Sequence, residues 1–205
     1  MKILSEYVSN EFCVKGSRFL AELFPCNEQS VAKELIKSQK IKYADSTHVV
    51  HAFIIGKNAE IMGMSDDGEP SGTAGRPSLD VLKGFSCTDT LLTITRWFGG
   101  TLLGTGGLVK AYGDSAKQVL SCAEKNGSFK EFIKKTAFSF RCSYSIYQTL
   151  KHIMPLFEAV PIEEKFESEV FISCCVPEKN SLDFCKKIQD LSNGTVQIVQ
   201  ENPSL

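Results

Sequence analysis

A strand, a glycine-rich segment and a long helix follow one another in TLLTITRWFGGTLLGTGGLVKAYGDSAKQVLSCAEKNG, residues Thr90 to Gly127. The run Thr90–Trp97 is apolar and β-branched, which predicts a buried strand. Apolar residues recur at helical spacing over Leu108–Lys125, and Asn126-Gly127 is a good stop signal for that helix. Glycine weakens regular structure, so its repetition between the two elements indicates a sharp turn or a close backbone approach.

Upstream, strand-like and helix-like stretches precede another glycine-rich signature, SDDGEPSGTAGRP at Ser65–Pro77. Strands are expected at Ile3–Val14, Arg18–Phe24, His48–Ile55 and Ala59–Met64, and helices at Glu28–Ser38 and just after Pro77. Together with the stretch above, these elements predict a first α+β domain of residues 1–127.

The second half of the chain has a simpler pattern. Residues 128–135 are polar and are expected to be a linker. Strands are then expected near 136–142, 159–167, 169–176 and 195–200, and helices near 144–157 and 180–192. Two βαβ halves of this size are typical of a ferredoxin-like βαββαβ domain, here residues 136–205.

The composition predicts a globular protein that stays in the cytoplasm. The 205 residues are 42% hydrophobic and 23% charged, and they contain no apolar run long enough for a membrane span and no signal peptide. Residues 136–205 carry six Lys and Arg against nine Asp and Glu, a balance of −3, whereas the rest carries 17 against 15, a balance of +2. An anion-binding role is therefore expected in the first domain, with no specificity for DNA.

The eight cysteines form no CxxC pair. Their spacing and apolar surroundings predict small buried side chains in a reducing compartment rather than disulfides or a zinc site. We expect no bound metal and no cofactor.

Known nucleotide motifs do not fit the second signature. Gly104 and Gly106 begin a dinucleotide fingerprint, but Val109 stands at its last glycine. Gly99 and Gly104 have the spacing of a phosphate loop, but Thr105 replaces its lysine. The segment still suits an anion in another way, because a glycine loop before a helix exposes free backbone N–H groups.

Residues Gly104, Gly106 and Gly107 would form that loop, with Arg96 just upstream and Lys110 one turn inside the helix. The alternative is a tight strand-to-helix turn that only allows close packing. Both interpretations stay open.

The first signature is acidic. Asp66, Asp67 and Glu69 would suit Mg²⁺ or acid–base chemistry. A carboxylate–arginine network with Arg76 and Arg96 that orders two loops is the favoured interpretation. The segment Ser71-Gly72-Thr73-Ala74-Gly75 is either an anion nest or a turn.

His48 and His51 have the spacing of a metal pair on a helix, but they lie in a predicted strand. Residues three apart on a strand point to opposite faces, so the two rings are not expected to bind one ion.

At four places the chain resembles the YigZ/IMPACT family. They are KGSRF at Lys15–Phe19, ADSTHVVHAF around His48, SDDGEPSGTAGRP at Ser65–Pro77, and RWFGGTLLGTGGLVKAY at Arg96–Tyr112. The resemblance implies a first domain similar to the second domain of ribosomal protein S5. It also implies that the second domain is similar to the C-terminal domain of bacterial YigZ-like members and to a ferredoxin-like domain of elongation factor G.

The resemblance also implies a setting in translation. Eukaryotic relatives are associated with control of initiation under amino-acid starvation, by competing for an activator of an initiation-factor kinase. They carry an N-terminal RWD domain that this sequence lacks, so that partner is not carried over. Many members have His and Cys after the position matching His48, where Val49 and Val50 stand here.

We therefore expect a non-enzymatic regulator of translation that binds RNA, the ribosome or a protein partner through the first domain, with the second as an interaction module. The alternative is a metal-assisted enzyme acting on a phosphorylated small molecule, with Asp66, Asp67 and Glu69 as its reactive groups. The candidate binding residues are Lys15, Arg18, His48, Ser71, Thr73, Arg76, Arg96, Gly104, Thr105, Gly106, Gly107 and Lys110.

Overall fold

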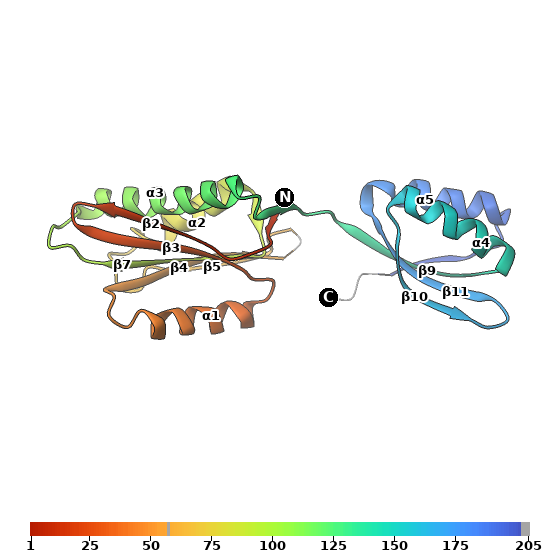
Figure 1. Ribbon diagram of the computed structural model, residues 1–205, viewed down its shortest axis with the longest axis horizontal. Coiled ribbons are helices and arrows are strands. Elements are labelled where there is room, and N and C mark those ends of the chain that lie inside the picture. The colour runs from red at the N-terminus through yellow and green to blue at the C-terminus, as the bar shows by residue number, and fades with distance from the viewer. Residues whose placement is uncertain (57, 202–205) are drawn as a thin grey trace. The chain divides into compact units, whose positions relative to one another are not determined.

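The computed structural model describes residues 1–56 and 58–201 and divides the chain into two compact units (Figure 1). The first unit is Met1–Phe132, and the second begins at Ile133. Each unit combines helices with β-sheet, so the predicted α+β class is confirmed. The last residues of the predicted second domain, 202–205, lie outside the described residues. Within the described chain, no helix is long and apolar enough to cross a membrane.

The first unit is built around a five-stranded antiparallel sheet. Its strands are β2 (Val8–Val14), β3 (Ser17–Pro25), β4 (His48–Ile55), β5 (Ile61–Ser65) and β7 (Thr90–Trp97). They are ordered β2-β3-β7-β4-β5, so β7 is central. Because side chains alternate along a strand, Leu92 and Ile94 enter one core and Leu91 enters another on the opposite face.

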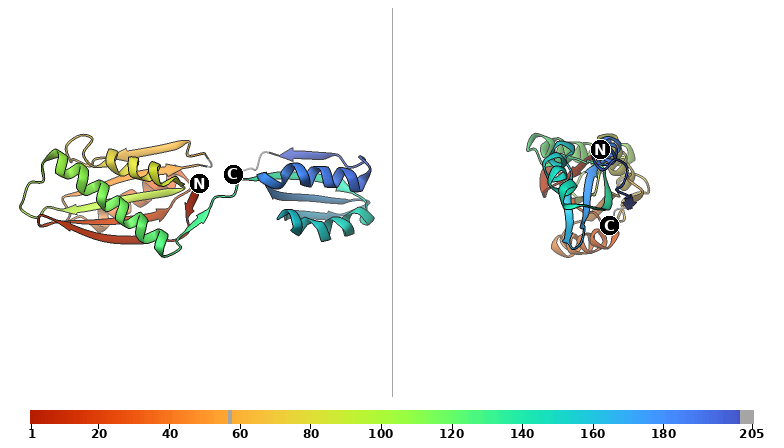
Figure 2. Two further views of the ribbon diagram at one scale, coloured as in Figure 1. Left: turned by 90° about the horizontal axis from the view of Figure 1, so that it is seen from above. Right: turned by 90° about the vertical axis from the view of Figure 1, so that its right-hand side faces the viewer.

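Helices cover both faces of this sheet (Figures 1 and 2). On one face lies α1 (Gln29–Lys42), and on the other lie α2 (Gly75–Phe85) and α3 (Gly104–Lys125). The larger core lies beneath α2 and α3. A smaller sheet joins β1 (Lys2–Leu4), β6 (Cys87–Thr88) and β8 (Phe129–Glu131).

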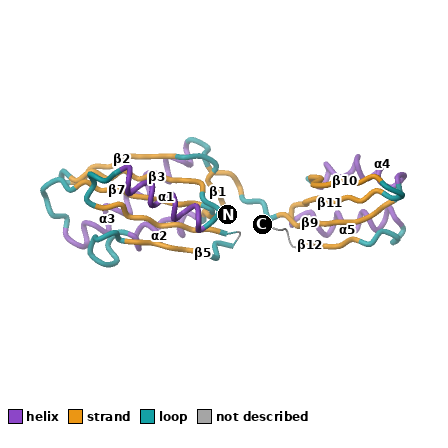
Figure 3. The backbone as a smooth tube through the Cα atoms, turned by 90° about the horizontal axis from the view of Figure 1, so that it is seen from below, coloured by secondary structure: helices purple, strands orange, loops and turns teal. Residues whose placement is uncertain are grey.

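The second unit is a four-stranded antiparallel sheet with both helices on one face (Figures 1 and 3). Its elements are β9 (Lys135–Cys142), α4 (Tyr144–Ile153), the 3₁₀ turn η1 (Met154–Phe157), β10 (Val160–Phe166), β11 (Val170–Pro177), α5 (Glu178–Ser192) and β12 (Ile198–Glu201). The strand order is β10-β11-β9-β12. Phe184 and Ile188 of α5 are fully buried against this sheet and anchor a separate core.

Several element boundaries differ from those expected. The stretch Ile3–Val14 is two strands, because β1 leaves the main sheet to pair with β6 and β8. The strand β8 occupies part of the expected linker. The helix α3 starts at Gly104 and so includes the expected glycine loop in its first turn. All eight cysteines are free, and Cys13 is exposed rather than buried.

Candidate functional site

A pocket of about 410 Å³ in the first unit brings the two glycine-rich signatures together. The first signature contributes residues 68–70, and the second contributes Arg96, Phe98 and residues 102–105. His48, at the start of β4, completes one wall. The end of β7, the start of β4 and the first turn of α3 therefore meet at one site.

A buried ion pair lies beneath this pocket. Arg96 Nη1 donates to Glu69 Oε1 at 2.6 Å, and the hydroxyl of Tyr112 donates to the same oxygen at 2.8 Å. The side chains of Arg96 and Glu69 are only 6% and 3% exposed. Burial, together with the Glu69 carboxylate, raises the pKa of Tyr112, so its hydroxyl keeps its proton and stays a donor. The pair links the two glycine-rich segments.

Arg76 does not take part in this link. Its Nε lies 2.9 Å from Asp80 Oδ2, and both side chains are exposed. The helix was expected only after Pro77, whereas α2 begins at Gly75, so Arg76 and Asp80 are one turn apart on the same helical face. The expectation that Arg76 orders two loops is therefore corrected.

Asp66 occupies the expected anion nest with its own carboxylate. Its oxygens accept N–H bonds from Gly72 at 2.8 Å, Ala74 at 3.0 Å and Gly75 at 2.8 Å. Burial raises the pKa of Asp66, but these three bonds outweigh burial and hold the pKa below its ordinary value. The carboxylate of Asp66 therefore caps the start of α2.

Asp67 fixes the edge of β4. Its Oδ2 accepts the N–H of Val49 at 2.7 Å, and its Oδ1 pairs with Lys40 of α1. Its carbonyl oxygen lies 2.7 Å from Nδ1 of His48. Because a carbonyl oxygen only accepts, Nδ1 carries the proton, and Nε2 faces Glu69 Oε2 at 4.0 Å.

The two histidines lie on opposite faces of β4, as the strand geometry predicts. His48 lines the pocket, whereas His51 stacks against Phe53 on the α1 side. Burial and the nearby Lys40 lower the pKa of His51. Among the described residues, no group of three or more His, Cys, Asp or Glu side chains is placed to hold a metal ion.

The first turn of α3 borders the pocket, and the N–H groups of a helix's first turn have no partners within the helix. Gly104 begins the helix with φ of +71°, and Gly106 and Gly107 continue it. The first turn contains no acidic side chain, and no side chain among the described residues caps it. Gly104 and Thr105 line the pocket, whereas Lys110 is exposed further along the helix.

Two other candidates belong to the loop before α2. Ser71 is exposed, and neither it nor Thr73 lines the pocket. Thr73 is buried, and its hydroxyl donates to the carbonyl of Pro70 at 2.6 Å. Thr73 therefore shapes the loop around Asp66, and Ser71 lies on its surface.

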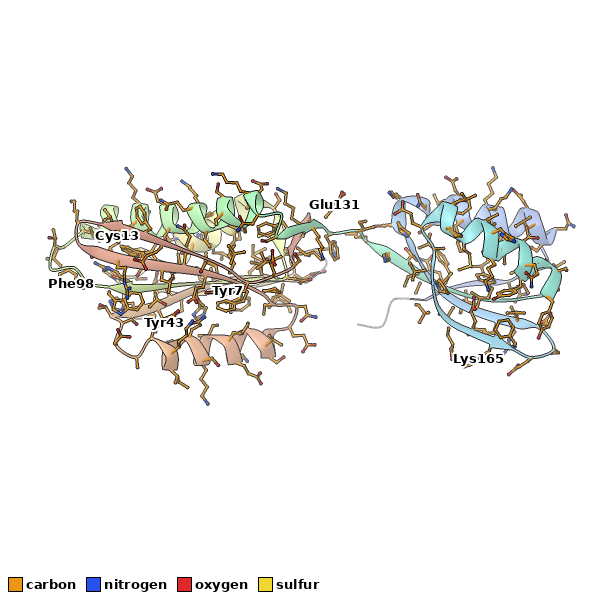
Figure 4. The ribbon with its side chains drawn as sticks, in the orientation of Figure 1. Tyr7, Cys13, Tyr43, Phe98, Glu131 and Lys165 are labelled. Atoms are coloured by element: carbon orange, nitrogen blue, oxygen red, sulfur yellow. The ribbon has the colours of Figure 1, made fainter. Side chains whose placement is uncertain are left out.

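A cationic and aromatic surface borders the pocket at the end of β7. We call Lys15, Arg18, Trp97 and Phe98 the tip. The guanidinium of Arg18 lies 3.9 Å from the Trp97 ring centroid, and Phe98 is 47% exposed. Lys15 is exposed in the β2–β3 turn. Figure 4 shows Phe98 projecting beyond the end of the sheet.

Sequence reasoning missed several contributors. Tyr112 lies among the apolar residues that recur at helical spacing in α3, and only its hydroxyl distinguishes it from the leucines and alanines around it. The Oγ of Ser17 lies 3.4 Å from Arg96 Nη2 and accepts the Gly99 N–H at 3.2 Å. Trp97 and Phe98 were treated as part of a strand and its end. The available signal was the position of these two aromatic residues directly before Gly99 and Gly100.

Comparison with known proteins identifies relatives along nearly the whole chain. Residues 15–120 match the Impact N-terminal domain. The chain is 33% identical to IMPACT family member YvyE of Bacillus subtilis, over 95% of this chain and 88% of that protein. It is 30% identical to IMPACT family member YigZ of Escherichia coli, over 91% and 90%.

A crystal structure of a hypothetical protein is also similar, with a TM-score of 0.67 and 28% identity over 99% of this chain and 98% of that chain. The paired glycine-rich signatures that form the pocket lie inside the matched domain. This chain belongs to the IMPACT family.

Proposed function

We propose that this chain is a cytoplasmic regulator of translation that acts by binding, and that the tip of the first unit binds RNA. The observation that carries the proposal is the stacked pair of Arg18 and Trp97 beside the exposed ring of Phe98. Aromatic faces stack with unpaired bases, and arginine adds charge and planarity. The family's association with translation supports RNA over other polyanions.

Binding is favoured over catalysis because the acidic candidates already serve the fold. Asp66 caps α2, Asp67 holds β4 and α1, and Glu69 is buried against Arg96. A catalytic carboxylate needs an open face toward its substrate. Asp66 and Asp67 instead accept backbone N–H bonds, Asp67 also pairs with Lys40 of α1, and Glu69 accepts from Arg96 and Tyr112.

A second candidate is an enzyme acting on a phosphorylated small molecule, favoured by the pocket that holds His48 beside the first turn of α3. Its test is a turnover screen of phosphorylated metabolites with and without Mg²⁺, comparing the wild type with Asp67→Asn. Turnover that this substitution abolishes without unfolding the protein would replace the binding proposal.

We assign the first unit to the folds similar to the second domain of ribosomal protein S5, and the second unit to the ferredoxin-like folds. The strand order β10-β11-β9-β12, with helices after β9 and β11, supports the second assignment. The acidic second unit would then contact a partner other than RNA.

The RNA proposal is tested by fluorescence anisotropy with a labelled single-stranded oligoribonucleotide over a range of salt concentrations. Wild-type affinity should fall steeply as salt rises, because phosphate contacts release counterions. Loss of a stacking ring in Phe98→Ala should weaken binding roughly ten-fold. Loss of one cation in Arg18→Ala should reduce the salt slope by about 1.

Arg141→Ala is the matched control. Arg141 has surroundings similar to those of Arg18. Its guanidinium lies 5.5 Å from the centroid of the Phe171 ring, and its half-exposed side chain pairs with a glutamate, as that of Arg18 does beside Trp97. Arg141 belongs to the second unit, so Arg141→Ala should leave the affinity for the oligoribonucleotide unchanged. Binding that is absent at every salt concentration, or weakened equally by both arginine variants, would reject the RNA site at the tip.

A further inference from the structure

We infer that the edge strand β5 and the groove beside it bind an extended acidic segment of a partner protein, which adds a strand to the five-stranded sheet. The strand β5 is last in the order β2-β3-β7-β4-β5, so one side of its backbone has no neighbouring strand among the described residues (Figure 3). Backbone N–H and C=O groups along such an edge pair readily with a strand from another chain. This partner is additional to the RNA proposed for the tip.

The side chains of β5 leave its edge unprotected. Ile61, Met62 and Met64 are 42%, 43% and 46% exposed, and the strand contains neither a charged residue nor a proline. Two other edge strands are protected. In β2, Asn10 donates to a glutamine of α3 at 3.2 Å, and β10 contains Pro161, an adjacent register shift and three charged residues. Such features keep an edge from pairing with other chains, so their absence from β5 favours a binding edge.

A groove of about 540 Å³ lies between α1 and β4, and we call it the α1 groove. Phe53 of β4 lines this groove. Its ring occupies the space that a Cβ atom on Gly63 of β5 would fill. The lining of the α1 groove therefore continues from β4 to the edge strand.

Lysines give the α1 groove a positive charge. The charged side chains of the described residues that line it are those of Lys33, Lys37 and Lys40. Lys40 pairs with Asp67, whereas neither Lys33 nor Lys37 has an ion-pair partner in the described part of the chain. An acidic segment would supply the opposite charge. RNA fits less well, because it cannot extend a β-sheet, and because Phe53 is 7% exposed and offers no open face to a base.

The register between β4 and β5 predicts the pattern of the partner segment. Gly63 lies opposite Phe53, whose side chain enters the core beneath α1. Met62 and Met64, on either side of Gly63, therefore point to the other face of the sheet. A strand added to β5 would place alternate side chains near the lysines of α1 and the others beside the two methionines. The partner segment should thus alternate acidic with apolar residues.

The test measures fluorescence anisotropy with the full chain and three sets of labelled peptides of about ten residues. In the first set, Glu or Asp alternates with Val, Ile, Leu or Phe. In the second, Lys replaces every acidic residue, and in the third, the composition of the first is kept without the alternation. Members of the first set should bind roughly ten-fold tighter than their counterparts. Equal binding of the three sets, or no binding by the first, would overturn the inference.

Two charge-reversed variants test the location. Lys33→Glu combined with Lys37→Glu should weaken binding of the acidic peptides roughly ten-fold, because two attractions become repulsions. Lys83→Glu combined with Lys125→Glu makes the same change of charge on α2 and α3, which cover the other face of the sheet, and should leave binding unchanged. All four lysines are exposed, so both variants should remain folded, as circular dichroism would show. Equal weakening by both variants would exclude the α1 groove.

Pairing of the main chain is tested with the tightest peptide of the first set, N-methylated at alternate residues. Methyl groups in one register should abolish binding, because they block the N–H groups that pair with β5, whereas methyl groups in the other register should spare it. Binding that survives both registers would overturn strand addition.

Other occupants give different results. RNA affinity that falls in the Lys33 and Lys37 variant, without peptide binding, would assign the α1 groove to RNA and overturn the inference. A dimer in analytical ultracentrifugation that the acidic peptide does not dissociate would assign β5 to a second copy of the chain and also overturn it. Phe98→Ala should leave peptide binding unchanged, so the RNA site at the tip and the peptide site fail or stand independently.

Discussion

Asp66 and Glu69 are three residues apart in one loop, yet they hold different parts of the first unit. Asp66 accepts three backbone N–H bonds and orders the start of α2. Glu69 is buried and fixes Arg96 at the end of β7. Both carboxylates therefore stabilise the fold, and Glu69 also lines the pocket.

Replacing Asp66 with alanine should lower the free energy of unfolding by about 1–2 kcal/mol, because the N–H groups at the start of α2 lose their acceptor. Urea unfolding followed by circular dichroism measures the loss. Asp80→Ala is the control, since it removes only an exposed pair with Arg76 and should change stability little. Equal losses in both variants would contradict the capping role.

The contribution of Asp66 should also depend on pH. Its pKa in the folded state is held below the ordinary value of 3.8, so the folded state favours the ionised carboxylate. The stabilisation is therefore complete well above pH 3.8 and is lost as the pH falls through the lower folded-state pKa. The stability difference between wild type and Asp66→Ala should shrink in acid.

The role of a residue could be predicted only where its interaction partner is a side chain of recognisable charge. The Arg96–Glu69 link follows from complementary charges in two glycine-rich segments. The capping by Asp66 was missed because its donors are backbone groups six to nine residues later, which no side-chain pattern marks. The pairing of Arg76 with Asp80 was missed because the helix was expected only after Pro77, whereas α2 begins at Gly75.

At the scale of elements, the two strands that flank the pocket were predicted with their observed bounds, His48–Ile55 and Thr90–Trp97. Their apolar, β-branched composition leaves little alternative to burial in a sheet. The start of α3 was set four residues late, because glycine is a poor helix former and resembles a loop. Tertiary packing of the helix over β2 and β3 outweighs that local preference.

The interface between α1 and the sheet contains several buried polar side chains. Five buried side-chain atoms there lack a hydrogen-bond partner among the described residues. They are Glu22 Oε2, Gln39 Oε1, His51 Nδ1, Thr93 Oγ1 and Thr95 Oγ1. The register places Glu22 opposite Thr93, and Thr93 opposite His51. The attachment of α1 thus relies less on apolar packing than that of α3 does.

Thr93→Val should raise the free energy of unfolding by about 1 kcal/mol, because it replaces an unpaired buried hydroxyl with a methyl group of similar shape. Thr90→Val in the same strand is the control. Thr90 is equally buried, but its hydroxyl donates to the Thr88 carbonyl at 2.8 Å, so its loss should be destabilising. A loss of stability in Thr93→Val would show that its hydroxyl is paired in solution.

At the scale of the whole molecule, the chain contains separate cores on either side of Phe132. The strand β8 belongs to the first unit through its pairing with β1, although its residues read as linker. A short polar strand at the edge of a small sheet gives almost no periodic signal. Only its pairing with β1, more than a hundred residues earlier in the chain, identifies β8 as a strand.

Fragments 1–132 and 133–205 should each fold alone. Dispersed amide signals in NMR spectra and cooperative urea unfolding of each fragment would show this. The first fragment should retain the RNA affinity of the full chain, because the basic balance and the tip both lie within it. A fragment ending at residue 127 should be less stable, since it lacks β8. An unfolded 1–132 fragment would contradict separate folding.

The tip depends on two glycines that touch through their backbones. A Cβ atom added to Gly16 would lie 2.7 Å from the Gly99 carbonyl oxygen, and one added to Gly99 would overlap the Gly16 backbone. Because both obstacles are main chain, no compensating change of side chain elsewhere could make room. A substitution at either glycine therefore has the same consequence. The backbones of the β2–β3 turn and of the end of β7 must both change conformation.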